Sequence, residues 1–188
     1  GPATLSINVT TGVIDLSAST VGGPHIVTYS TPGTCSDNST FDISILAEED
    51  PSFGFAAVTY CQGDADPTPT ITGTPGGVFS STAGLSINVG TGEIDVSAST
   101  SGTTYTITYT TTGVCPNAST FDVTIVSEDD PSFTFPFGSY CQAGADATPT
   151  ITGTVGGTFT APAGISIDAT TGIIDVSAST TGGPYIIT

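Results

Sequence analysis

Residues 104–110 read TYTITYT, in which large apolar side chains alternate strictly with threonine. In an extended chain successive side chains point to opposite faces, so the tyrosines and the isoleucine share one face and the threonines share the other. Such a period of two indicates a β-strand with one buried face. The segments LSINV at 85–89 and FDVTI at 121–125 alternate in the same way, and no segment keeps a helical period. The sequence therefore predicts an all-β fold.

These segments belong to a sequence that repeats with a constant step. The ten residues TGEIDVSAST at 91–100 have near copies, TGVIDLSAST at 11–20 and TGIIDVSAST at 171–180. The cysteines keep the same step, because Cys35 is followed by Cys115 and Cys61 by Cys141. Solenoid units have about 20–45 residues. The longer step of this chain suits a small domain with its own core.

Each repeat contains short alternating segments separated by turns rich in Gly, Pro, Asn and Thr. About seven such strands are typical of an immunoglobulin-like domain. We therefore expect tandem immunoglobulin-like β-sandwich domains with an 80-residue repeat and boundaries just before each DPSF. Residues 51–130 then form a complete repeat, 1–50 the carboxy-terminal part of one repeat and 131–188 the amino-terminal part of the next. Because the sequence opens within a repeat, we expect it to be an excerpt of a longer protein.

The composition narrows the classes of partner. The chain has 17 acidic residues, no lysine or arginine and one histidine, which gives a formal net charge of −17 at pH 7. Nucleic acids and anionic membranes are bound mainly through cationic side chains, so neither is expected as a partner. Hydrophobic residues make up 37% of the chain, too much for a disordered acidic tail. No apolar run approaches the roughly 20 residues that a membrane span needs.

Enzymatic activity is not expected. The single histidine, His25, stands where the other repeats have Tyr105 and Tyr185, so we expect it to replace an aromatic side chain that points inward. One unrepeated histidine cannot supply a Ser-His-Asp or Cys-His set to each repeat. The glycine-rich turns also lack the lysine and the helix of a phosphate-binding loop.

The pattern YCQ...PTPTITGT...GG.F...G.SI...TG.ID.SAST covers nearly the whole chain. It resembles the tandem immunoglobulin-like repeats of very long bacterial surface adhesins and secreted filament proteins, notably those of gliding bacteria. The resemblance implies an extracellular or cell-surface location and a structural or adhesive role in a stalk or fibre. Neighbouring repeats, or copies of the same protein, would then be the partners. An alternative function is the binding of glycans or another surface through the sandwich loops or the threonine-rich face.

The four cysteines suggest an oxidising, extracellular setting. Either Cys61 pairs with Cys115 within the complete repeat, or Cys35 pairs with Cys61 and Cys115 with Cys141 across the boundaries. In a sandwich whose first and last strands start at the same pole, Cys61 and Cys115 would lie close together. The alternative would have to span a last strand of roughly 33 Å, whereas a disulfide allows about 6 Å between Cα atoms. A Cys61–Cys115 disulfide is therefore favoured, with Cys35 and Cys141 paired outside the excerpt.

Acidic clusters precede both DPSF motifs and make calcium a candidate cofactor, because adjacent carboxylates repel one another unless a cation or solvent screens them. No other cofactor is expected. The alternative is a solvated acidic hinge. The candidate ligands are Glu48, Glu49, Asp50, Glu128, Asp129 and Asp130, completed by Asp66 or Asp146.

Two further sets of residues recur among the repeats. We expect Asp15, Asp95 and Asp175, in the motif TG.ID, to accept hydrogen bonds from the backbone or from the serine hydroxyls that follow them. N-glycosylation sequons begin at Asn8, Asn38 and Asn117, and the alternative for these three is an exposed asparagine in a turn.

Overall fold

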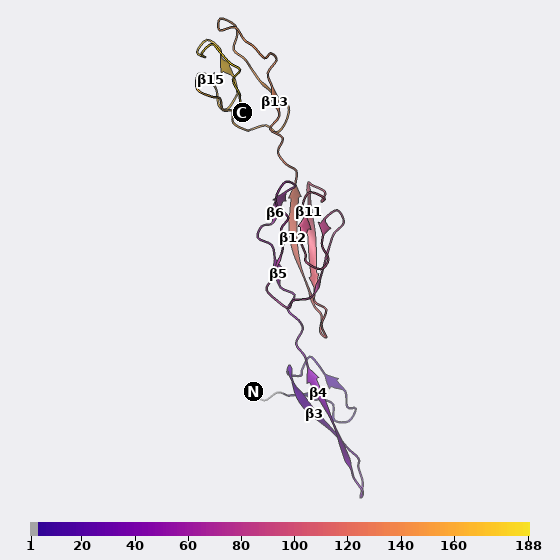
Figure 1. Cartoon of the computed structure of the whole chain (residues 1–188). Coiled ribbons are helices and arrows are strands. Elements are labelled where there is room, and N and C mark those ends of the chain that lie inside the picture. The colour runs from indigo at the N-terminus through magenta and orange to yellow at the C-terminus, as the bar shows by residue number, and fades with distance from the viewer. Residues whose placement is uncertain (1–3) are drawn as a thin grey trace. The chain divides into compact units, whose positions relative to one another are not determined.

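The computed structural model describes residues 4–188, and these residues contain strands and turns but no helix (Figure 1). The predicted all-β class is confirmed. Contacts divide the chain into two compact units, Gly1–Ser127 and Glu128–Thr188. The second unit starts three residues before the predicted boundary at 130/131, and the predicted boundary at 50/51 lies inside the first unit. The division into three parts therefore stays a prediction. Residues 4–188 include no helix long and apolar enough to cross a membrane.

Residues 53–126, which we call the complete repeat, form a sandwich of one four-stranded sheet and two short strand pairs. Its strands are β5 (Phe53–Gly54), β6 (Thr59–Cys61), β7 (Thr70–Ile71), β8 (Val78–Ser81), β9 (Ser86–Ile87), β10 (Ile94–Asp95), β11 (Thr103–Thr110) and β12 (Ala118–Val126). The sheet has the order β6-β12-β11-β8, in which β6 and β12 are parallel and the other pairs are antiparallel. The pairs β5-β7 and β9-β10 contribute Phe53, Ile71 and Ile87, which pack against the buried core. Figure 1 shows β11 and β12 side by side at the centre of this repeat.

The segment TYTITYT forms most of β11 and behaves as its alternation predicts. Tyr105, Ile107 and Tyr109 are at most 1% exposed, whereas the threonines between them lie on the outer face. Both buried tyrosine hydroxyls are hydrogen-bonded: that of Tyr105 donates to the Thr100 carbonyl at 2.6 Å and that of Tyr109 to the Thr74 carbonyl at 2.8 Å. The polar ends of the core tyrosines thus fasten two loops to the sheet.

Each of the two partial repeats contains some of the strand pairs of the complete repeat. Residues 4–47 form β1 (Ser6–Ile7) with β2 (Ile14–Asp15) and β3 (Gly22–Ser30) with β4 (Asn38–Ile45). The second unit forms β13 (Phe133–Thr134) with β14 (Thr150–Ile151) and β15 (Ser166–Ile167) with β16 (Ile174–Asp175). The hairpins β1-β2, β9-β10 and β15-β16 start at equivalent serines of the three repeats and share one register. The repeated sequence therefore gives a repeated local structure.

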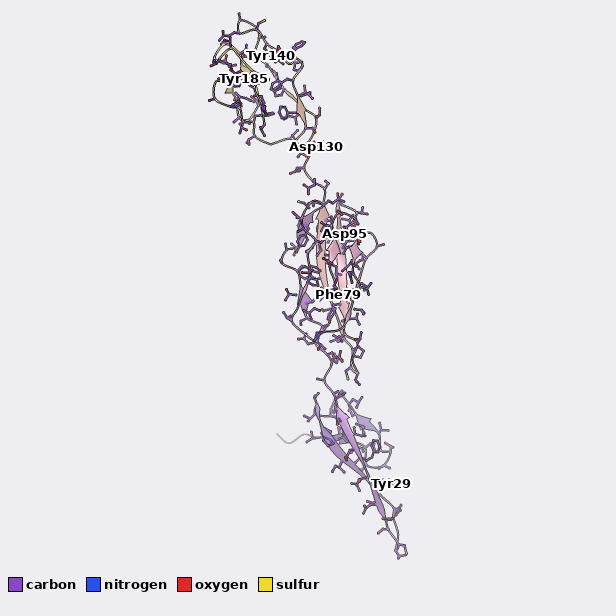
Figure 2. The ribbon with its side chains drawn as sticks, in the orientation of Figure 1. Tyr29, Phe79, Asp95, Asp130, Tyr140 and Tyr185 are labelled. Atoms are coloured by element: carbon purple, nitrogen blue, oxygen red, sulfur yellow. The ribbon has the colours of Figure 1, made fainter. Side chains whose placement is uncertain are left out.

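The core face of residues 4–47 is open. Tyr29 is 68% exposed and Leu16 66%, whereas their equivalents Tyr109 and Val96 are fully buried. No described residue packs onto this segment as β5 to β8 pack onto the complete repeat. Figure 2 shows the same contrast between Tyr29, which projects from its hairpin, and Phe79, which lies inside the complete repeat. The second half of a repeat thus buries its apolar side chains only against the first half.

Candidate functional site: the linker and the loops that hold it

The linker that enters the complete repeat, residues 48–51, lies against the loop 111–117 between β11 and β12. The Glu49 amide donates to the Cys115 carbonyl at 2.9 Å, and the Gly113 amide donates to the Glu49 carboxylate at 3.1 Å. The Asn117 side-chain amide donates to the Glu48 carboxylate at 3.4 Å. Two of the three linker acids are therefore held by neutral donors of this loop.

The turn 72–76 holds the other side of the linker. The Asp50 amide donates to the Thr74 hydroxyl at 3.3 Å, and the Thr74 amide donates to the Asp50 carbonyl at 2.7 Å. Residue 73 must be glycine, because a Cβ there would collide with the Asp50 carbonyl oxygen and lie 2.8 Å from the carbonyl carbon. The turn can reach the linker backbone only without a side chain at this position.

The linker of the second unit meets its own turn in the same way. The Asp130 amide donates to the Thr154 hydroxyl at 3.0 Å, and the Thr154 amide donates to the Asp130 carbonyl at 2.6 Å. A Cβ on Gly153 would collide with that carbonyl oxygen. The contact between linker and turn is therefore a property of the repeat.

The last acid of each linker is turned toward the serine two residues ahead. The Asp50 carboxylate accepts from the Ser52 amide at 3.0 Å and from the Ser52 hydroxyl. These bonds, that of the hydroxyl first, lower the pKa of Asp50 below its ordinary value of 3.8. Asp130, labelled in Figure 2, accepts from the Ser132 amide at 2.9 Å, and its pKa is lowered by the Ser132 hydroxyl and amide.

The structure does not gather the predicted calcium ligands around one point. Among residues 4–188 no group of three or more His, Cys, Asp or Glu side chains is placed to hold a metal ion. Four of the linker acids face the donors described above: Glu48, Glu49, Asp50 and Asp130. Asp66 and Asp146 instead accept from the backbone amides of Val96 at 3.0 Å and of Val176 at 3.3 Å, so each fastens the residue that follows the TG.ID aspartate. Calcium binding at the linkers stays a prediction.

The two cysteines of the complete repeat lie at opposite ends of β12. Cys61 pairs with Val126, the last residue of that strand, whereas Cys115 lies three residues before the strand begins. The nine residues of β12 span about 26 Å at ~3.3 Å per residue, far more than the roughly 6 Å between Cα atoms that a disulfide allows. The expectation that both cysteines stand at one pole is wrong, because Cys61 is at the end of a strand parallel to β12. The structure does not bring the predicted Cys61–Cys115 pair together.

The other two cysteines, Cys35 and Cys141, are exposed. Their predicted pairing with cysteines outside the excerpt stays a prediction.

The aspartates of the TG.ID motif have the local structural role predicted for them. The Asp95 carboxylate accepts from the Ser97 hydroxyl and from the Ala98 amide, both at 2.8 Å. The Ala98 amide, followed by the Ser97 hydroxyl, lowers the pKa of Asp95. Asp15 and Asp175 make the same bonds, and their pKa values are lowered chiefly by the hydroxyls of Ser17 and Ser177.

Asp95→Asn should make the complete repeat less sensitive to acid. A carboxylate whose pKa is lowered by folding stabilises the fold fully above its unfolded pKa, and this stabilisation is lost as the pH falls through the lower folded pKa. Asparagine keeps an oxygen acceptor for Ser97 and Ala98 but has no charge. Urea unfolding midpoints of parent and variant should therefore differ at neutral pH and converge as the pH falls below 3.8. A difference that stays constant down to the lowest pH would contradict this role of Asp95.

Sequence reasoning missed the function of the glutamine in YCQ. The Gln62 side-chain amide donates to the Ser99 carbonyl at 2.8 Å, and Gln142 donates to Ser179 at 2.9 Å. The Gln62 backbone amide donates to the Val126 carbonyl at 3.0 Å. Gln62 thus joins the end of β12 to the SAST turn. The recurrence of YCQ in the next repeat, at 140–142, was the available signal.

The asparagines of two sequons are engaged within the protein. The Asn8 side-chain oxygen accepts from the amides of Thr10 and Thr11, both at 3.0 Å, and Asp168 accepts in the same way at the equivalent position. Because an aspartate accepts the same bonds at the equivalent position, this position requires a side-chain oxygen that accepts hydrogen bonds. Asn117 donates to Glu48, as described, whereas Asn38 is exposed. Glycosylation of these three residues stays a prediction.

His25 replaces a core tyrosine, as predicted. It is 9% exposed, and its Nε2 lies 3.3 Å from the Thr20 carbonyl oxygen. Tyr105 and Tyr185 reach the equivalent carbonyls of Thr100 and Thr180 with their hydroxyls. The histidine therefore makes the bond to the SAST turn that tyrosine makes in the other repeats.

Comparison with known proteins found solved structures whose sequence identity and structural similarity to this chain are both low. No protein-family model matches the chain, and no curated protein matches it. Protocadherin gammaB7 EC3-6 is 11% identical with a TM-score of 0.40, over 93% of this chain and 57% of that chain. Mouse cadherin-23 EC22-24 is 16% identical with a TM-score of 0.36, over 79% and 62%. Mouse clustered PcdhgC3 EC1-3 is 11% identical with a TM-score of 0.36, over 93% and 75%. The chain thus spans less than two thirds of the first two structures.

Proposed function

We propose that the chain is a structural module of a bacterial extracellular stalk or fibre, in which successive sandwich repeats act as spacers. The observation that carries this proposal is the docking of each linker onto the repeat that follows it. Glu49 and Asp50 bond to two separate loops of one repeat, and Asp130 repeats the contact with the turn. A linker held in this way restricts bending at the joint, which a spacer needs and an isolated binding domain does not.

Electron microscopy of a recombinant protein of three complete repeats tests the proposal. Negatively stained particles should be rods of three beads with a narrow distribution of angles at each joint. Collapsed particles, or joints that take every angle, would contradict a spacer role.

Gly73→Ala should release the linker from the complete repeat. The new Cβ would collide with the Asp50 carbonyl oxygen and lie 2.8 Å from its carbon, and backbone atoms cannot yield at such distances. Loss of the bonds to Thr74 should speed amide hydrogen exchange in residues 48–52 by roughly tenfold. Exchange in β11 and β12 should change little.

Gly90→Ala is the matched control for this change. A Cβ there meets only the Asn88 side-chain oxygen at an ordinary 3.6 Å, so linker exchange should stay at the parental rate. Equal acceleration in both variants would show that the docked linker does not depend on Gly73.

Binding of glycans or another surface is the second candidate function. Ser80, Thr108 and Thr120 lie in register across three strands of the outer face, and none of their hydroxyls has a hydrogen bond to another described side chain. Neighbouring strands are about 4.8 Å apart, so these hydroxyls form a regular polar row. A glycan array probed with the protein tests this function. Signal that is lost when Thr108 and Thr120 are replaced by valine would favour this function. An array without signal, probed with protein that forms rods in the microscope, would exclude glycan binding and favour the spacer role.

A further inference from the structure

We propose that each linker contains a self-cleaving Asp–Pro bond, at Asp50–Pro51 and at Asp130–Pro131, which the folded repeat prepares for scission in acid. The nucleophile would be the aspartate's own carboxylate and the product a chain cut between repeats. The chain has a third Asp–Pro bond, Asp66–Pro67, whose surroundings differ. These three bonds in one molecule allow the effect of structure to be separated from that of sequence.

The geometry places the nucleophile beside the bond to be cut. The Asp50 carboxylate accepts from the Ser52 amide at 3.0 Å, and the ring closed by this hydrogen bond contains the Asp50–Pro51 peptide bond. This hydrogen bond therefore holds the carboxylate next to its own peptide bond. Asp130 and Ser132 repeat this arrangement at 2.9 Å. Holding the reacting groups together in this way replaces an entropic cost that a free chain would have to meet at the moment of reaction.

The same repeat stabilises the charge that develops on the attacked carbonyl. The Thr74 amide donates to the Asp50 carbonyl oxygen at 2.7 Å, and the Thr154 amide donates to that of Asp130 at 2.6 Å. A backbone donor aimed at this oxygen stabilises the tetrahedral intermediate, in which the oxygen becomes negative. The leaving group is a proline nitrogen, which has no proton to donate to the fold.

The step balances without any cofactor. One carboxylate oxygen of Asp50 bonds to the Asp50 carbonyl carbon, which closes a five-membered cyclic anhydride. The bond from that carbon to the Pro51 nitrogen breaks, and the nitrogen takes a proton from hydronium and leaves as a secondary amine. Water then opens the anhydride and leaves Asp50 with a free α-carboxyl group.

Acid supplies the proton, and the nucleophile stays charged. The bonds from Ser52 lower the pKa of Asp50, so its carboxylate remains ionised to a lower pH than an ordinary aspartate. The other titratable groups beside it are Glu48 and Glu49 on the linker and Cys115 on the loop 111–117, and the turn 72–76 has none. Beside Asp130 stand Glu128 and Asp129, and the turn 152–156 has none.

The third bond lacks these features. The Asp66 carboxylate accepts from the Val96 amide, 30 residues away, at 3.0 Å, and among the described residues it has no hydrogen bond from the residue two ahead that would close a turn around its own peptide bond. In the folded chain Asp66–Pro67 should therefore be cut more slowly than the two linker bonds. In the unfolded chain all three bonds should be cut at similar rates.

Intact-mass spectrometry of the 188-residue chain at about pH 3 tests this proposal, with circular dichroism confirming that the fold persists. The expected fragments are 1–50, 51–130 and 131–188, and the same incubation in guanidinium should add cuts at 66/67. The cleavage time in guanidinium sets the time scale. Equal rates at 50/51 and 66/67 in the folded chain, or intact linkers after that time, would overturn the proposal.

Three variants identify the groups that act. Asp50→Glu keeps the charge but would need a six-membered anhydride, so the cut at 50/51 should be lost while that at 130/131 continues. Ser52→Ala should slow the cut at 50/51 by roughly threefold to tenfold relative to 130/131 in the same molecule. Ser132→Ala should reverse that ratio. A loss of stability confined to the complete repeat would also speed the cut at 66/67, which lies in that repeat, whereas loss of the Ser52 bonds alone would change only the cut at 50/51.

Discussion

Tyr109→Ala is expected to unfold the complete repeat, whereas Tyr29→Ala, at the equivalent position of the open segment 4–47, is expected to change stability little. Tyr109 is fully buried, and its ring centre lies 4.6 Å from that of Phe79. Replacing a buried aromatic side chain by alanine costs about 3–5 kcal/mol, which is comparable to the whole stability of a small domain. Tyr29 is 68% exposed, and exposed substitutions usually stay within about 0.5 kcal/mol.

Hydrogen exchange measures this effect directly, in peptides covering residues 103–126 for Tyr109→Ala and in peptides covering the equivalent residues 23–46 for Tyr29→Ala. Protection should collapse in Tyr109→Ala and stay at the parental level in Tyr29→Ala. Tyr109→Phe should lower the free energy of unfolding of the complete repeat by about 1–3 kcal/mol, less than Tyr109→Ala does. It removes the hydroxyl that bonds both the Thr74 carbonyl and the Gly77 amide. Similar losses for the two alanine variants would mean that the open segment 4–47 is packed in solution.

Gly92→Ala should destabilise the complete repeat by about 2–5 kcal/mol through two separable causes. Gly92 has φ +74°, a left-handed conformation that costs an L-residue about 1–2 kcal/mol. A Cβ there would also lie 2.6 Å from Pro69 and 2.8 Å from the ring of Phe79. Phe79 belongs to the buried core, so the backbone would have to move.

Gly12→Ala separates the two causes. Gly12 has nearly the same conformation, φ +71°, but nothing lies within 4 Å of the position that its Cβ would take. Only the conformational cost of about 1–2 kcal/mol should appear there. Thermal unfolding followed by circular dichroism should place the Gly92 variant well below the Gly12 variant. Equal shifts would show that the turn conformation alone requires glycine.

The sequence alone predicted the strands that alternate strongly. In 104–110 every second residue is apolar, and this pattern survives because one face of β11 packs on the core while the other meets solvent. The role of Asp95 was also predictable, because an aspartate followed two residues later by serine can form its bonds within a few residues. Such local features need no knowledge of the partner strands.

The sequence could not predict the ends of the repeat. Cys61 was expected at the start of a strand, but β6 is a three-residue strand parallel to β12, and Cys61 lies at its end. The linker acids looked like a cation site because a sequence shows their charges but not their donors. Those donors, such as the Gly113 amide and the Asn117 side-chain amide, belong to a loop distant in the sequence and carry no charge. Nearly every residue type has a backbone amide, so the residue types of a sequence do not show which amide will donate to a linker acid.

The parallel pairing of β6 with β12 has a mechanical consequence. Tension along the chain would pull β6 toward its amino-terminal side and β12 toward its carboxy-terminal side, so the two strands would slide past one another. Thr59, Tyr60 and Cys61 face Thr124, Ile125 and Val126 in that ladder. Its hydrogen bonds, extended by those from Thr124 to Val58 and from Gln62 to Val126, lie across the direction of pull and would have to rupture together. A repeat whose hydrogen bonds are loaded in shear and must rupture together withstands a higher force than one whose hydrogen bonds rupture one after another.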